Sequence, residues 1–269
     1  MASRVDHDEP DPSWFVCGTL SWQDVGRVQQ RLPSLLDPPI TFGHRGAKAY
    51  ARENTIESFQ LALKLGASGR ESDVWLTADG VPVLDHDGDF RSGRFRKRAI
   101  STVRRDDLPE FIPALHELFD ACGTDYDLSL DLKDPHAGPA VIETVRSHAH
   151  GLLPHLWLCH HDVGMLVDLR PLDDEVKLVD STRLHRIDEG PERRAARLAD
   201  VGVDGINMRK SDWNGGLVAL FHRFGRTAFS WDLQHDHELR PALRMGIDGV
   251  YSDYPDRMVN AFTSEFGSE

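Results

Sequence analysis

Two carboxylates stand two residues apart in the segment ESDVWL, at Glu71 and Asp73. Alternate residues of an extended strand point to the same face. In a protein interior an unpaired carboxylate is costly and a second one repels the first, so a cation would relieve the pair. Hard divalent ions such as Mg²⁺ and Ca²⁺ take oxygen ligands. The spacing therefore predicts a divalent-cation site. The alternative is that the two carboxylates lie on the solvent-exposed face of the strand and that Ser72 and Val74 point inward.

The segment DLSLDLK repeats this arrangement later in the chain. Asp131 and Lys133 are again two residues apart at the end of an apolar run, and Ser129 precedes them on the same face. We expect one more oxygen ligand and one fixed cation to enter the same site.

Two histidines accompany these charges. His44 ends the run ITFGH and is followed by Arg45, while His86 follows a turn centred near Asp79 that places it opposite residues 71 to 73. Arginine recognises phosphate with a planar fork, and lysine recognises it as a point charge. Two histidines could act as general base and general acid in an in-line displacement at phosphorus. The set predicts a site for a phosphate bridged by a metal.

The elements that carry these residues alternate between short apolar runs and helix-period segments from Ile40 onward, which is typical of an α/β fold. The expected strands are 40 to 44, 70 to 76, 81 to 85, 127 to 132, 155 to 159, 176 to 180, 204 to 208, 227 to 231 and 248 to 252. Only four residues separate the second from the third, so these two must form a hairpin. The remaining eight favour a TIM (β/α)8 barrel with a short β-hairpin/loop insertion after the second strand. An open doubly wound sheet is the alternative.

Domain boundaries follow from the same pattern. Residues 1 to 38 form an acidic extension that ends in LDPP, and we expect it to pack on a barrel domain of residues 39 to 269. Within the barrel domain, Asn54 followed by Glu57 resembles a capping box at the start of a helix.

Bulk properties narrow the function. A formal net charge of -13 argues against nucleic-acid binding. The 3 cysteines show no metal-binding or disulfide spacing. No run approaches a membrane span or signal peptide, so we expect a cytoplasmic protein, with its oligomeric state left open.

Four motifs together resemble the glycerophosphodiester phosphodiesterase family. They are HRG at 44 to 46, ENT at 53 to 55, ESDVWLTADGVPVLDHD at 71 to 87 and SDYPD at 252 to 256. The resemblance covers about residues 40 to 257 and implies a TIM-barrel hydrolase that cleaves small-molecule glycerophosphodiesters to glycerol 3-phosphate and an alcohol, with a divalent cation, Mg²⁺ or Ca²⁺, as cofactor.

The resemblance also implies a role for each matching residue. His44 and His86 would be the acid/base pair. The metal would be held by Glu71, Asp73 and Asp131, and the substrate would be contacted by Arg45, Glu53, Lys133 and Trp231.

This sequence departs from the family pattern at several positions. Asp131 stands where the family usually has glutamate, and Arg52 stands where proline is common before ENT. Trp231 matches the family's late tryptophan, but the segment WDLQHD that begins with it departs from the common continuation. We expect a short loop here in place of the larger substrate-cap insertion. Its arginine-rich stretch, residues 91 to 105, could attract a phosphodiester or simply be salt-paired at the surface. A lysophospholipase D-like lipid phosphodiesterase and a non-catalytic phosphometabolite-binding barrel are the alternative functions.

Overall fold

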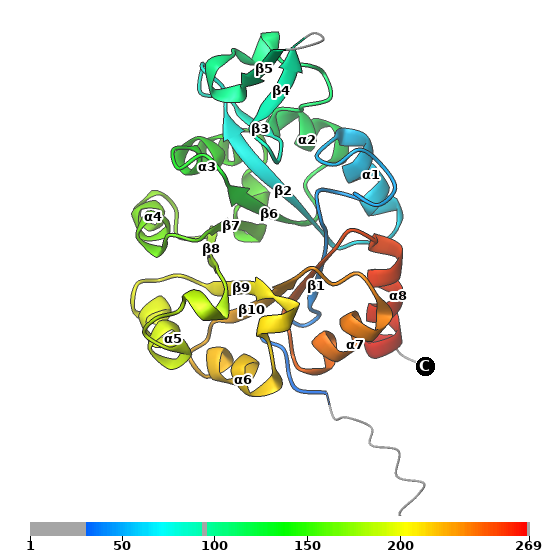
Figure 1. Ribbon diagram of the computed structural model, residues 1–269, viewed down its shortest axis with the longest axis vertical. Coiled ribbons are helices and arrows are strands. Elements are labelled where there is room, and N and C mark those ends of the chain that lie inside the picture. Colours follow the sequence, from blue (N-terminus) through cyan, green and yellow to red (C-terminus); the bar gives the residue numbers. More distant parts are fainter. Residues whose placement is uncertain (1–30, 93–95, 268–269) are drawn as a thin grey trace, which may run out of the picture. The chain divides into compact units, whose positions relative to one another are not determined.

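The computed structural model describes residues 31–92 and 96–267 of the chain. Its main sheet is a closed barrel of eight parallel strands (Figure 1). They are β1 (Ile40–Gly43), β2 (Gly69–Leu76), β6 (Asp127–Leu132), β7 (Leu156–His160), β8 (Lys177–Ser181), β9 (Gly205–Arg209), β10 (Thr227–Trp231) and β11 (Gly249–Ser252). Because β1 pairs in parallel with both β2 and β11, the ring of eight parallel strands is closed. The TIM barrel is confirmed, and the open doubly wound sheet is excluded.

Eight α-helices surround the barrel in the described residues: α1 (Ile56–Lys64), α2 (Leu115–Cys122), α3 (Ala137–His148), α4 (Val163–Leu169), α5 (Pro191–Asp200), α6 (Gly215–Arg223), α7 (Asp236–Arg244) and α8 (Pro255–Phe266). Six short 3₁₀ turns accompany them, η1 (Ile100–Thr102), η2 (Arg105–Asp107), η3 (His150–His155), η4 (Arg170–Leu172), η5 (Leu184–Arg186) and η6 (Lys210–Asp212). No described helix has the length and apolar character to cross a lipid bilayer.

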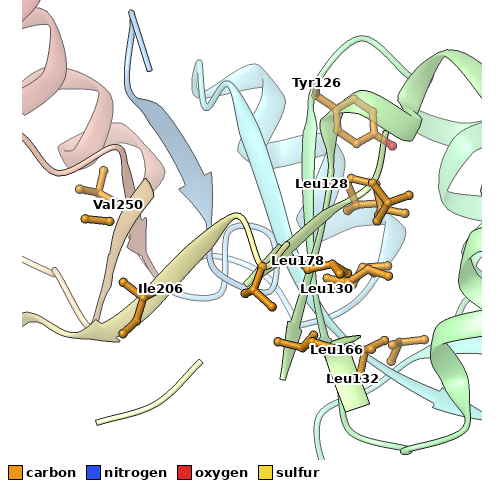
Figure 2. Close-up of a cluster of buried hydrophobic side chains, with 14 of the residues drawn as sticks. Tyr126, Leu128, Leu130, Leu132, Leu166, Leu178, Ile206 and Val250 are labelled. Atoms are coloured by element: carbon orange, nitrogen blue, oxygen red, sulfur yellow. The ribbon is translucent and has the colours of Figure 1, made fainter. Parts of the chain in front are cut away.

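The hydrophobic core of the barrel itself has two parts because strand side chains alternate between two faces. A third, smaller cluster lies in the insertion after β2, around Val83 and Ile100. Outward-facing side chains such as Leu128, Leu130 and Leu132 of β6 pack under the helices and are buried (Figure 2). Inside the barrel, Phe42 stacks on Tyr251 with ring centroids 4.7 Å apart. These rings fill the middle of the barrel, so the polar side chains nearer the strand ends lie above an apolar floor.

The insertion after β2 begins with β3 (Pro82–Leu84), which runs antiparallel to β2 with Val74 opposite Leu84. The expected hairpin is confirmed. The arginine-rich stretch then forms a second hairpin of β4 (Asp89–Ser92) and β5 (Arg96–Ala99). Several of its cations are paired at the surface, through the contacts Lys97–Asp89, Arg104–Asp79 and Arg105–Glu117.

The last part of the expected extension contacts the barrel at the end where the strands begin. The backbone N–H groups of Leu35 and Leu36 and the hydroxyl of Ser34 donate to the carboxylate of Asp248, which is fully buried just before β11. Residues 1 to 30 of that extension lie outside the described residues.

Candidate active site

A cavity of about 410 Å³ opens where the barrel strands end. That volume suits a small-molecule ligand. Seven of the nine predicted site residues line it: His44, Arg45, Glu71, Asp73, Asp131, Lys133 and Trp231. Glu53 and His86 do not line it.

Three carboxylates form a cluster at one side of this cavity. Glu71 and Asp73 are buried and point inward from β2, with 6% and 2% of their surface exposed, so the alternative with Ser72 and Val74 inward is wrong. The strand register places Asp131 of β6 directly beside Asp73. Oxygen atoms from the three side chains lie within 4.8 Å of one another. A set of hard oxygen donors this close together fits a divalent cation.

The electrostatics of the cluster support this fit. Burial raises the pKa of Glu71 to about 7; His44 opposes this shift, whereas the negative charges of Asp73 and Asp131 add to it. Burial likewise raises the pKa of Asp131, although Lys133 opposes it. The carboxylates therefore repel one another, and added positive charge at the cluster would stabilise their ionised forms.

Two basic residues already contact the cluster. The Lys133 ammonium lies 3.0 Å from Asp73 Oδ1 and donates to Asp131 Oδ2 at 3.1 Å. Burial alone would lower the pKa of Lys133, but these two carboxylates raise it. Arg45 Nε lies 3.3 Å from Asp73 Oδ2 and has no hydrogen-bond partner of good geometry. These cations are positioned to bind an anion that approaches the cluster.

Glu53 and Asn54 do not line the cavity but form hydrogen bonds with residues that do. Both oxygens of Glu53 accept from Arg45 at 3.1 Å. The Asn54 side chain accepts from Ser72 and donates to Asp73 at 3.3 Å, and its backbone has a φ of 55°. Thr55, not Asn54, caps helix α1, so the expected capping role of Asn54 is wrong. Asn54 is instead tied to the carboxylate cluster.

His44 is held by an aspartate that the sequence analysis did not select. The Nδ1 atom of His44 lies 2.5 Å from Asp253 Oδ1, and its Nε2 lies 3.8 Å from Glu71 Oε2. Since a carboxylate accepts, Nδ1 carries the hydrogen. Burial would lower the pKa of His44, but Glu71 and Asp253 outweigh it and the pKa is raised. Asp253 comes directly after β11, and its place in the motif SDYPD was the available signal.

The backbone beside His86 contacts the strand that carries the cluster, but the His86 side chain does not line the cavity. The N–H of Asp85 donates to the carbonyl of Asp73 at 3.0 Å, as the hairpin predicted. The imidazole of His86 is 37% exposed, and its Nδ1 lies 2.8 Å from Asp87 Oδ1. The ring is thus not among the groups that line the cavity.

The opposite wall comes from the ends of β8, β9 and β10. The centroid of the Trp231 ring lies 5.9 Å from the Arg183 guanidinium carbon and 5.8 Å from that of Arg209. Asp232, at a φ of 68°, accepts two hydrogen bonds from Arg209. Of the residues on this wall, only Trp231 was predicted from the sequence as a site residue.

Comparison with known proteins agrees with the fold and the motifs. Residues 44–123 match the model of the glycerophosphoryl diester phosphodiesterase family. A glycerophosphodiester phosphodiesterase of Bacillus altitudinis is 25% identical over 81% of this chain and 96% of its own length. The crystal structure of a Thermotoga maritima glycerophosphodiester phosphodiesterase superposes with a TM-score of 0.72 at 24% identity, covering 82% of this chain and 97% of that one. An Oleispira antarctica phosphodiesterase, solved with its product sn-glycerol-3-phosphate, gives a TM-score of 0.73 at 23% identity over 83% and 96%.

Proposed function

We propose that this chain, which belongs to the glycerophosphodiester phosphodiesterase family, hydrolyses glycerophosphodiesters to glycerol 3-phosphate and an alcohol. The observation that carries the proposal is one cavity in which a buried carboxylate cluster, two cations and an oriented histidine meet. A negatively charged phosphodiester needs positive charge to bind and proton transfer to break its ester bond, and this site offers groups for both.

The carboxylates of Glu71, Asp73 and Asp131 would hold the divalent cation, Mg²⁺ or Ca²⁺. When bound, such a cation polarises a phosphoryl oxygen and stabilises developing negative charge. Asp131 is one methylene shorter than the usual glutamate, but its strand register beside Asp73 still brings it into the cluster.

The phosphate would be held by Arg45 and Lys133, whose positions are fixed by the carboxylates of β2 and β6 and, for Arg45, by Glu53. Arg45 supplies a planar fork and Lys133 a point charge. Trp231, on the opposite wall, would offer an apolar face to the organic part of the diester.

In an in-line displacement a water oxygen attacks phosphorus while the alcohol oxygen leaves on the far side. One group takes a proton from the water and another gives a proton to the leaving oxygen. His44 and His86 would form this pair. Asp253 fixes His44 with Nδ1 protonated, so Nε2, which faces Glu71, is the atom that exchanges the proton. His86 would need to turn its ring toward the cavity.

Single alanine variants test the two histidines. We expect His44→Ala and His86→Ala to lose release of glycerol 3-phosphate from glycerophosphocholine or glycerophosphoglycerol while keeping the wild-type circular dichroism spectrum. General acid or base groups typically contribute about 10²- to 10⁴-fold to the rate. Near-normal turnover by either variant would refute the assignment of that histidine. A cytoplasmic location stays a prediction from the sequence.

A further inference from the structure

Almost all charged side chains that line the cavity form an ion pair or a hydrogen bond with another side chain. Its lining contains five cations of arginine and lysine: Arg45, Lys48, Lys133, Arg183 and Arg186. The first three pair with carboxylates of the cluster side. Arg183 donates two hydrogen bonds to Asp212. Among residues 31–92 and 96–267, the Arg186 side chain forms neither an ion pair nor a hydrogen bond with another side chain.

The carboxylates in the lining also have partners. Glu71, Asp73 and Asp131 form the cluster, Asp253 holds His44, and Asp232 accepts from Arg209 and lies 3.5 Å from Lys210. A cationic ligand group would therefore find no unpaired carboxylate on the described wall. An anionic group would find one unpaired guanidinium.

Arg186 stands across the cavity from the proposed reaction centre. It ends the turn η5, which follows β8, whereas His44 and Arg45 follow β1. In the strand order β1-β11-β10-β9-β8 on one side and β1-β2-β6-β7-β8 on the other, β8 is four strands from β1 in both directions. A substrate whose phosphate lies at Arg45 would have to extend one of its arms across the mouth to reach Arg186.

We propose that Arg186 forms a subsite for an anionic group, a phosphate or a carboxylate, on the alcohol arm of the substrate. The inference rests on the proposed diester hydrolysis and narrows its substrate class. A guanidinium recognises both groups through paired N–H donors. Arg183, which is fixed by Asp212, and Trp231 line the same cavity, and the arm would lie along them. Diesters with a neutral or cationic alcohol lack this contact.

Matched substrates isolate the contact. Glycerophosphoglycerol has a neutral alcohol arm. Bis(glycerophospho)glycerol adds a second phosphodiester to that arm. The phosphodiester that joins glycerol to the hydroxyl of glyceric acid carries a carboxylate where glycerophosphoglycerol has a hydroxymethyl group. We would measure kcat/KM for each compound at low and high salt. The value for bis(glycerophospho)glycerol is divided by the number of its equivalent scissile ester bonds, so that the compounds are compared per bond. The variants are Arg186→Gln and, as a control, Arg193→Gln, an exposed arginine of α5 outside the cavity lining.

We expect the wild type and Arg193→Gln to prefer the anionic arms by about fivefold, the upper range for an exposed charge pair, and to lose the preference as salt screens it. Arg186→Gln should lose it at all salt concentrations. An unchanged ratio in Arg186→Gln, or no wild-type preference, would overturn the inference.

A binding measurement separates this inference from the proposed function. The His44→Ala variant, which should not turn over, is titrated calorimetrically with the same compounds, with and without Arg186→Gln. Tighter binding of the anionic arms that depends on Arg186 supports the subsite even if the wild type hydrolyses none of them, and equal affinities refute it. Absence of hydrolysis for every compound refutes the proposed function alone.

Discussion

The contact between His44 and Asp253 is the feature of the site whose removal has the clearest expected cost. Asp253→Asn keeps the size of the side chain and removes its charge. The wild-type pair is joined at 2.5 Å between Nδ1 and Oδ1. The asparagine can accept through its oxygen or donate through its nitrogen, and the second arrangement would present the wrong tautomer of His44 for proton transfer at Nε2.

The magnitude follows from the geometry. A hydrogen bond to a charged group contributes about 1.5–3 kcal/mol. The two side chains are 28% and 24% exposed, so solvent weakens the contact and the lower half of that range applies. A loss of about 1.5–2 kcal/mol in transition-state stabilisation corresponds to a decrease in kcat/KM of about 10- to 30-fold.

The assay is release of glycerol 3-phosphate under saturating divalent cation, with kcat and KM determined separately. The control is Asp256→Asn, which removes a nearby carboxylate that, among residues 31–92 and 96–267, accepts a hydrogen bond only from the exposed Tyr50 hydroxyl. We expect the control to match the wild type and Asp253→Asn to fall mainly in kcat. Wild-type kcat/KM in Asp253→Asn, with the fold intact, would refute the view that Asp253 positions His44 for catalysis.

Two further changes probe the charges around the barrel. Asp131→Glu should tighten metal binding by about tenfold or less, because the longer side chain restores the reach that the family usually has; a metal titration identical to the wild type would mean that Asp131 is not a ligand. Asp180 is fully buried and lies 3.4 Å from Arg194. Burial raises its pKa from 3.8 to about 6, so the folded state binds the proton more tightly and the free energy of unfolding should fall by about 2.4 kcal/mol as pH rises from 4 to 7. Asp180→Asn should remove that decline in urea denaturation, and an unchanged pH dependence would contradict the shift.

The sequence was sufficient for the barrel because each strand carries a short apolar run bounded by turn residues. The segments 127 to 132 and 227 to 231 agree with β6 and β10 residue for residue, and 155 to 159 differs from β7 by one. The arginine-rich hairpin of β4 and β5 was expected as a loop, since its exposed basic side chains show no alternation of apolar and polar residues.

The carboxylate cluster was also predictable, because the period of two along β2 and β6 fixes which side chains share a face. Asp253 was not, since it meets His44 across 209 residues of chain and only the closed barrel brings them together. Arg186 belongs to a turn after β8, where no periodicity indicates the direction of a side chain.

The most direct test of the account is metal-dependent hydrolysis by the full chain. Purified protein would be incubated with glycerophosphocholine, glycerophosphoethanolamine, glycerophosphoinositol and a lysophospholipid, with Mg²⁺ or Ca²⁺ and with excess chelator. We expect release of glycerol 3-phosphate from at least one glycerophosphodiester, with this activity lost in chelator and restored by the metal. Full activity in chelator would contradict the cation site at Glu71, Asp73 and Asp131, and cleavage of the lysophospholipid alone would contradict the proposed substrate class.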